Sequence, residues 1–275
     1  MPQPKRALRR RQRLVLRYPV TAWERFYALF LIPVLLILVT ALLFKNYASP
    51  SLSILPPNAS FAYIGMALLH TFVRLCVAYA LAMAVSIPLA LLVESSPLME
   101  RLLLPVFDII QSVPVLAFFP VAIVFFLRFG LYGWSTVFIL FVSMLWNVVF
   151  SVVGGLKVIP NDIKSVASIF HVRGASYFLR VLLPSVVPYL VTGSLLAWAQ
   201  GWNIIIVAEV LHTYIPGASD ALDLFGIGSV LVHAISQGRD DVFFASIAVL
   251  VLVIAVLNLL VWQRLLHYAE RFRFD

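Results

Sequence analysis

The stretch VFFASIAVLVLVIAVLNLLVW, residues 242–262, contains no Asp, Glu, Lys or Arg. Its length matches the ~20 apolar residues that a helix needs to cross the ~30 Å hydrocarbon core of a bilayer. Inside lipid a lone segment satisfies its backbone hydrogen bonds only as a helix, because no water or neighbouring strand is available. The stretch therefore predicts a transmembrane helix and indicates a membrane protein.

The composition of the whole chain agrees with this prediction. Of the 275 residues, 63% are hydrophobic and 12% are charged, and the mean hydropathy is +1.01. A soluble domain carries roughly a quarter charged residues, so this chain has too little polar surface to be solvated by water. The net charge of +8 is concentrated before the first apolar run. Beside a membrane span such a cluster indicates topology and contact with anionic lipid, and we expect no nucleic-acid partner.

Sequence motifs of catalysis are missing. The chain has no P-loop, no Gly-x-Ser-x-Gly elbow and no His/Cys metal-ligand spacing. The single cysteine, Cys76, has no partner for an internal disulfide. The histidines are scattered over different segments and predict no metal site; they are His70, His171, His212, His233 and His267. We therefore expect a chain that is not an enzyme and binds no cofactor itself.

Six apolar runs are long enough to span a membrane, which predicts an all-α membrane protein with six transmembrane helices. The runs are Tyr27–Phe44, Ala67–Val93, Leu102–Leu127, Trp134–Gly155, Val187–Val207 and Val242–Leu265. Several contain proline, which should bend them. The first run has a long basic leader and no small-residue cleavage site, so a retained anchor is expected in place of a signal peptide.

The basic residues predict the orientation. With the N-terminus in the cytoplasm, sixteen of the 20 Lys and Arg residues lie in cytoplasmic segments, and three lie outside (Lys45, Arg128 and Arg239). This bias predicts that both termini are cytoplasmic. The predicted organisation is a basic cytoplasmic segment (1–26), a first span (27–45), a membrane core (66–265) and a cytoplasmic tail (266–275).

Two connections in the core are long. In the cytoplasmic loop 157–184, Pro160, Asn161 and Asp162 supply helix-capping residues, and apolar residues follow at helical spacing. The outer loop 208–241 contains a Pro216-Gly217 turn and the glycines Gly226 and Gly228, which suggest a re-entrant or interfacial element.

Motifs along residues 66–262 resemble, in order and spacing, those of binding-protein-dependent ABC importer permeases. They are Arg74 with Ile87-Pro88; Ser112-Val113-Pro114 through Pro120; Trp146-Asn147 with Gly154-Gly155-Leu156; Leu183-Pro184 with Trp198 through Glu209; and Gly226-Ile227-Gly228. The resemblance is to the nitrate, sulfonate, taurine and bicarbonate branch, including its duplicated-permease members. It implies the type I ABC importer permease core, with a cytoplasmic coupling helix between the fourth and fifth spans.

The family's coupling loop reads Glu-Ala-Ala, three residues, Gly, nine residues, then Ile-x-Leu-Pro. Anchored on Leu183-Pro184, the spacing puts Ser165, Val166 and Ala167 at the Glu-Ala-Ala positions and His171 at the glycine position. These departures fit either a relaxed constraint within one branch or one half of a heterodimer. An amphipathic helix here can seat in a groove of a soluble partner. The predicted ATPase-coupling residues are Asp162, Ser165, Val166, Ala167, Ile169, Phe170, His171, Arg173 and Gly174.

Polar residues inside spans are costly in hydrocarbon and should face the bundle interior or water. The candidates for a translocation pathway are Arg74, Asp108, Gln111, Ser112, Asn147, Gln200 and Asn203. A bundle-holding role is equally open for them, and an Arg74–Asp108 pair is possible. We hypothesise that Arg74 draws an anion through the outer half.

The resemblance implies a permease subunit in a bacterial inner membrane that pairs with a second permease chain, identical or different. Two cytoplasmic ABC ATPase subunits would hold ATP and Mg, and an extracytoplasmic solute-binding protein would deliver a small solute, an anion by resemblance. Two other classes stay open. A secondary transporter or channel would need intramembrane ionisable residues suited to proton or ion coupling, for which only Arg74 and Asp108 qualify. A non-transporting pseudo-permease scaffold would fit the altered loop.

Overall fold

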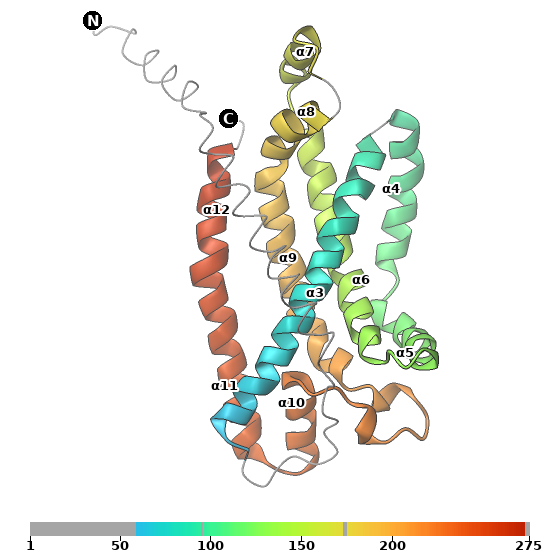
Figure 1. The fold of residues 1–275 in the computed structure, drawn as a ribbon, viewed down its shortest axis with the longest axis vertical. Coiled ribbons are helices and arrows are strands. Elements are labelled where there is room, and N and C mark those ends of the chain that lie inside the picture. Colours follow the sequence, from blue (N-terminus) through green and yellow to red (C-terminus); the bar gives the residue numbers. More distant parts are fainter. Residues whose placement is uncertain (1–58, 95, 173–174, 273–275) are drawn as a thin grey trace, which may run out of the picture. The chain divides into compact units, whose positions relative to one another are not determined.

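A computed structural model describes residues 59–94, 96–172 and 175–272 of the chain (Figure 1). All regular structure in these residues is helical. The predicted basic segment 1–26, the predicted first span and residues 273–275 lie outside the described residues. The number of spans is therefore settled only for the part that is described.

Four helices are long and apolar enough to cross a membrane. They are α3 (Phe61–Glu94), α6 (Gly133–Lys157), α9 (Leu183–Glu209) with its preceding π-helical turn η2 (Phe178–Leu182), and α11 (Asp240–Leu257). The last continues through η5 (Asn258–Trp262) and α12 (Gln263–Ala269) to η6 (Glu270–Phe272). These helices contain the predicted second, fourth, fifth and sixth spans.

The predicted third span, Leu102–Leu127, is not one continuous helix. It consists of α4 (Pro97–Ser112), the short η1 (Val115–Phe118) and α5 (Phe119–Arg128), with a bend of 79° between the two parts. Val113 is extended, with ψ 127°, because the ring of a following proline disfavours helical backbone, and Pro114 follows it. The pair counts as a fifth span if it crosses the membrane as a broken helix. Six spans remain a prediction.

Shorter helices occupy the two long loops. The loop 157–184 forms α7 (Asn161–Ile169) and α8 (Ala175–Tyr177), and α7 extends beyond the adjoining ends of α6 and α9 (Figure 1). The loop 208–241 forms η3 (His212–Tyr214), η4 (Asp220–Leu222) and the apolar helix α10 (Ile227–Ser236). In Figure 1, α10 and α5 lie at the end opposite α7.

The core of the described bundle forms where α6 packs between α3 and α9. Glycines allow close approach of these helices. A Cβ on Gly155 would collide with Tyr189, one on Gly193 with Ser151, and one on Gly201 with Met144. By contrast, α11 buries only Val242 and Ser246, so most of its apolar surface is available to lipid or another chain.

Candidate functional site

The helix α7 presents an apolar end to its surroundings. Val166, Ile169 and Phe170 are 51%, 71% and 74% exposed, whereas Ala167 is buried and Ile163 is half-buried. Asp162 and Ser165 are also exposed. An exposed aromatic side chain next to two exposed aliphatic ones, outside the spans, forms a surface suited to the groove of a soluble partner.

The end of α7 has a left-handed backbone. His171, at the glycine position of the family motif, has φ 53°. The turn is closed by the hydrogen bond from the Val172 N–H to the Ala167 carbonyl, 2.9 Å. Glycine is the residue best suited to this conformation, so the geometry gives a physical reason for the family's glycine here. Arg173 and Gly174 lie outside the described residues.

The pathway candidates fall into separate groups. Asp108, Gln111 and Ser112 are exposed together at the end of α4, where Gln111 donates to the Asp108 carboxylate at 2.9 Å. Asn147 is half-buried in α6 and donates to the carbonyl of Ser143. The structure does not bring Arg74 to Asp108.

Gln200 and Asn203 belong to an exposed face of α9. With Thr192, Leu196 and Ala199 they are spaced by three or four residues along the helix, so all five lie on one side. Exposed amide side chains within an apolar span need a protein or water partner, because hydrocarbon offers them none.

Arg74 forms a buried ion pair that the sequence did not reveal. Its Nη1 lies 2.7 Å from Oε1 of Glu209, and the two side chains are 1% and 0% exposed. Thr71 donates a second hydrogen bond to the same carboxylate oxygen, at 2.7 Å. The positive charge of Arg74 is thus balanced inside the protein. Its hypothesised role in drawing an anion stays a prediction.

The same carboxylate binds the start of α10. The Gly228 N–H donates to Oε2 of Glu209 at 2.8 Å, and the Ile227 N–H donates to the Thr71 hydroxyl at 2.9 Å. The first N–H groups of a helix have no partner within the helix and must find one elsewhere. A Cβ at Gly226 would collide with the Glu209 carboxylate, and one at Gly228 with the backbone of Ile206. Two sequence features could have indicated this contact: the Gly226/Gly228 pair, and Glu209 as an acidic residue at the end of an apolar run.

Two histidines that look unrelated in the sequence meet in the loop 208–241. The buried Asp223 accepts hydrogen bonds from the backbone N–H of His212 (3.0 Å), from its Nδ1 (2.8 Å to Oδ2) and from Nε2 of His233 (3.0 Å). Asp220 lies 3.7 Å from His212 and 3.9 Å from His233. The interpretation of these histidines as scattered is therefore wrong for this pair.

The contacts among His212, Asp220, Asp223 and His233 shift the pKa of two of these residues. Burial opposes ionisation of Asp223, but hydrogen bonds from His233 and His212 outweigh it and lower its pKa. The hydrogen bond to Asp223 raises the pKa of His233 against the effect of burial, helped by the charges of Asp223 and Asp220. Among the described residues no group of three or more His, Cys, Asp or Glu side chains could hold a metal ion.

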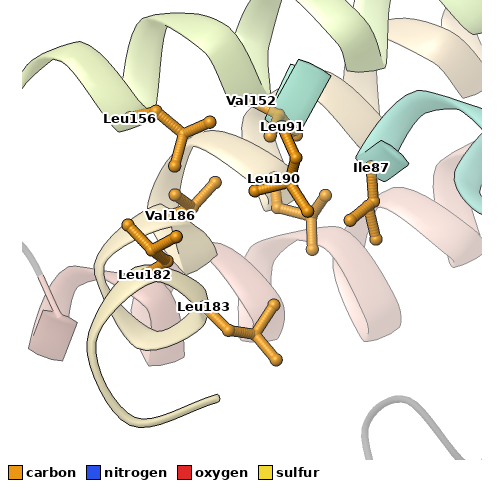
Figure 2. Close-up of a pocket in the computed structure, with 8 residues that line it drawn as sticks. All are labelled: Ile87, Leu91, Val152, Leu156, Leu182, Leu183, Val186 and Leu190. Atoms are coloured by element: carbon orange, nitrogen blue, oxygen red, sulfur yellow. The ribbon is translucent and has the colours of Figure 1, made fainter. Parts of the chain in front are cut away.

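A small cavity of about 20 Å³ lies between α3, α6 and the η2–α9 segment (Figure 2). Its eight lining side chains are all aliphatic, among them Ile87, Leu156 and Leu183. A space of this size without polar groups gives a water or an anion nothing to bind. We therefore do not assign a solute to it.

Comparison with known proteins completes this description. The family model described as "Binding-protein-dependent transport system inner membrane component" matches residues 82–267. The nitrate import permease protein NrtB of Leptolyngbya laminosa is 31% identical over 188 residues, 68% of this chain and 63% of that protein. The bicarbonate transport system permease protein CmpB of Synechocystis sp. is 31% identical over 144 residues, 52% and 50% of the two chains. The taurine transport system permease protein TauC of Escherichia coli is 24% identical over 186 residues, 68% and 63%.

The chain thus spans 50% to 63% of the length of these relatives. They confirm the resemblance to the nitrate, bicarbonate and taurine branch. The matched segment covers more than half of the chain and includes α7, the helices on both sides of it and α10. This multi-pass membrane protein belongs to the family of binding-protein-dependent transport system inner membrane components, the permeases of ABC importers.

Proposed function

We propose that this chain is the transmembrane permease subunit of an ATP-binding-cassette importer for a small anion. The observation that carries the proposal is the exposed apolar end of α7, formed by Val166, Ile169 and Phe170. It lies where the family motif has its coupling loop, and it offers anchors for a groove on a cytoplasmic ATPase. That ATPase would hold ATP and Mg, and this chain would bind no cofactor.

A second permease chain, identical or different, completes the pathway in this proposal. The exposed polar faces of α9 (Gln200 and Asn203) and of α4 (Asp108 and Gln111) support it. Polar groups of a span that are exposed in one chain alone require a partner chain or a water-filled path. The pathway would then run between these two faces.

The proposed substrate class comes from the relatives. NrtB, CmpB and TauC are named for nitrate, bicarbonate and taurine. Each of these solutes carries a compact, negatively charged oxygen group. An extracytoplasmic solute-binding protein would deliver such a solute to the outer face of a bacterial inner membrane. The basic residues support an orientation with both termini cytoplasmic.

The substitution Phe170→Asp tests the coupling surface. It places a charge on the exposed anchor and should leave membrane insertion intact, because Phe170 is 74% exposed. We expect ATPase activity to stop copurifying with the tagged chain in mild detergent. Phe129→Asp is the matched control, since Phe129 is 64% exposed and follows α5 at the opposite end. Copurification that survives Phe170→Asp would refute docking through α7.

A further inference from the structure

The first two free N–H groups of α10 are held by side chains of two different spans. Ile227 donates to Thr71 of α3, and Gly228 donates to Glu209 of α9. Thr71 also donates to Glu209, so the two acceptors are themselves linked across the spans. Hydrogen bonds weaken steeply once they stretch beyond about 3.2 Å. A shift between α3 and α9 of little more than 1 Å would therefore break this arrangement.

We propose that Glu209 and Thr71 form a seat for α10, which leaves the seat when α3 and α9 shift relative to each other. This part rests on the proposed importer, whose transport cycle would supply that shift between α3 and α9. Glu209 is a positioning residue in this scheme. Arg74 neutralises Glu209 and holds the carboxylate toward the start of α10.

The remaining contacts of α10 favour a discrete seated position. Its apolar side packs through Ile227, Val230 and Ala234 against Ile64 and Ala67 of α3 and against neighbouring residues. These apolar contacts are not directional and tolerate small displacements. The hydrogen bonds to the buried Glu209 carboxylate are directional, and the carboxylate is left without partners when their donors move away. Outside the spans, Nε2 of His233 in α10 donates to Asp223 of the preceding connection at 3.0 Å, and this contact is kept if the two segments move together. Among the contacts of α10 with α3 and α9, the polar seat is therefore the one that a small shift breaks.

The chain on both sides of α10 permits such a movement. On the N-terminal side, the connection from Val210 to Gly226 contains only two single-turn helices, η3 and η4. On the C-terminal side, a tight turn through Gly238, with φ 65°, leads into α11. Glycine adopts this conformation without strain, so the turn can rearrange at low cost.

A cysteine reporter tests the seat in the full-length chain. Ala234 is fully buried in α10 and small, so Ala234→Cys in a Cys76→Ala background labels with a water-soluble maleimide only when α10 leaves its position. The labelling rate is measured in opened membranes with Glu209→Gln, Thr71→Val or Thr71→Ser added. Val137→Cys, buried in the first turns of α6, reports general loosening. Ser143→Ala removes a buried hydroxyl that bonds only within α6 and is the matched control for Thr71→Val.

We expect Glu209→Gln to accelerate labelling at residue 234 about tenfold or more and Thr71→Val several-fold, as loss of a charged and a neutral hydrogen bond predicts. Thr71→Ser and Ser143→Ala should leave the rate unchanged, and residue 137 should stay protected. Unchanged labelling in both Glu209→Gln and Thr71→Val would overturn the seat, and so would equal acceleration at residue 137. The assay needs no transported solute, so a failure to find uptake would count against the proposed function alone.

Discussion

His171 has the left-handed backbone expected of the family's glycine although it is not a glycine. The sequence puts it where related permeases have glycine, and the structure gives it the left-handed backbone that glycine favours. Its Nδ1 lies 3.0 Å from the carbonyl of Ile169, two residues earlier. The turn after α7 is thus retained with a residue that pays a conformational penalty for it. The sequence aligned His171 with the glycine of the motif, but the left-handed turn at this position required the structure.

At this scale we predict that His171→Gly stabilises the protein by about 1 kcal/mol, because a left-handed conformation costs a side-chain-bearing residue roughly that amount. The temperature at which the purified chain loses its monodisperse elution peak should rise. His267→Gly is the matched control, since His267 is an exposed histidine with ordinary helical backbone in α12, and it should lower that temperature. A lower temperature for His171→Gly would contradict the strain at this position.

At the scale of elements, the sequence predicted the long spans well and the broken one poorly. Apolar run length marks α3, α6, α9 and α11, because burial in lipid depends on composition more than on any one contact. The break before α5 depends on Val113 and Pro114 alone, and a proline inside an apolar run is equally compatible with a gentle kink. The pairing of Glu209 with Arg74 links residues 135 positions apart, and no local pattern encodes it.

The helix α10 gives an element-scale prediction. Gly228→Ala should destabilise the chain by roughly 1–3 kcal/mol, because its methyl group has no room against the backbone of Ile206. Gly154→Ala in α6 meets no atom within 4 Å and should stabilise its helix by about 0.5–1 kcal/mol. The folded fraction of fluorescent fusions, followed by size-exclusion chromatography after heating, compares the two. Equal stability of both variants would show that α10 does not approach α9 this closely.

For the molecule as a whole, the polar clusters depend on how the chain folds back on itself. His212, Asp223 and His233 come together only because η3, η4 and α10 fold back on one another. Their separate places in the sequence gave no sign of this. The helix α7, in contrast, was predicted from its capping residues and the helical spacing of its apolar residues, because these are local patterns that need no tertiary partner.

From the paired side chains of Asp223 and His233 we predict that the stability of the protein depends on pH. His233 has a pKa raised above its ordinary 6.5, so its stabilising effect is complete below that value and is lost as the pH rises through the raised pKa. Asp223 has a pKa lowered from 3.8, so its effect is present above that value and is lost as the pH falls through the lowered pKa. The cluster therefore stabilises the protein most between the ordinary pKa values of Asp223 (3.8) and His233 (6.5). Asp223→Asn should remove the fall in melting temperature on the alkaline side of this window, and identical pH profiles for both proteins would rule out the cluster as its cause.

The close approach of α6 and α9 has a mechanical consequence. At Gly155 and Gly193 the two helices lie so near each other that an added methyl group would not fit between them, and such interlocked surfaces resist sliding. In the chain, α7 lies between the end of α6 and the start of η2 and α9. A rotation of either helix would therefore carry the other with it as one body.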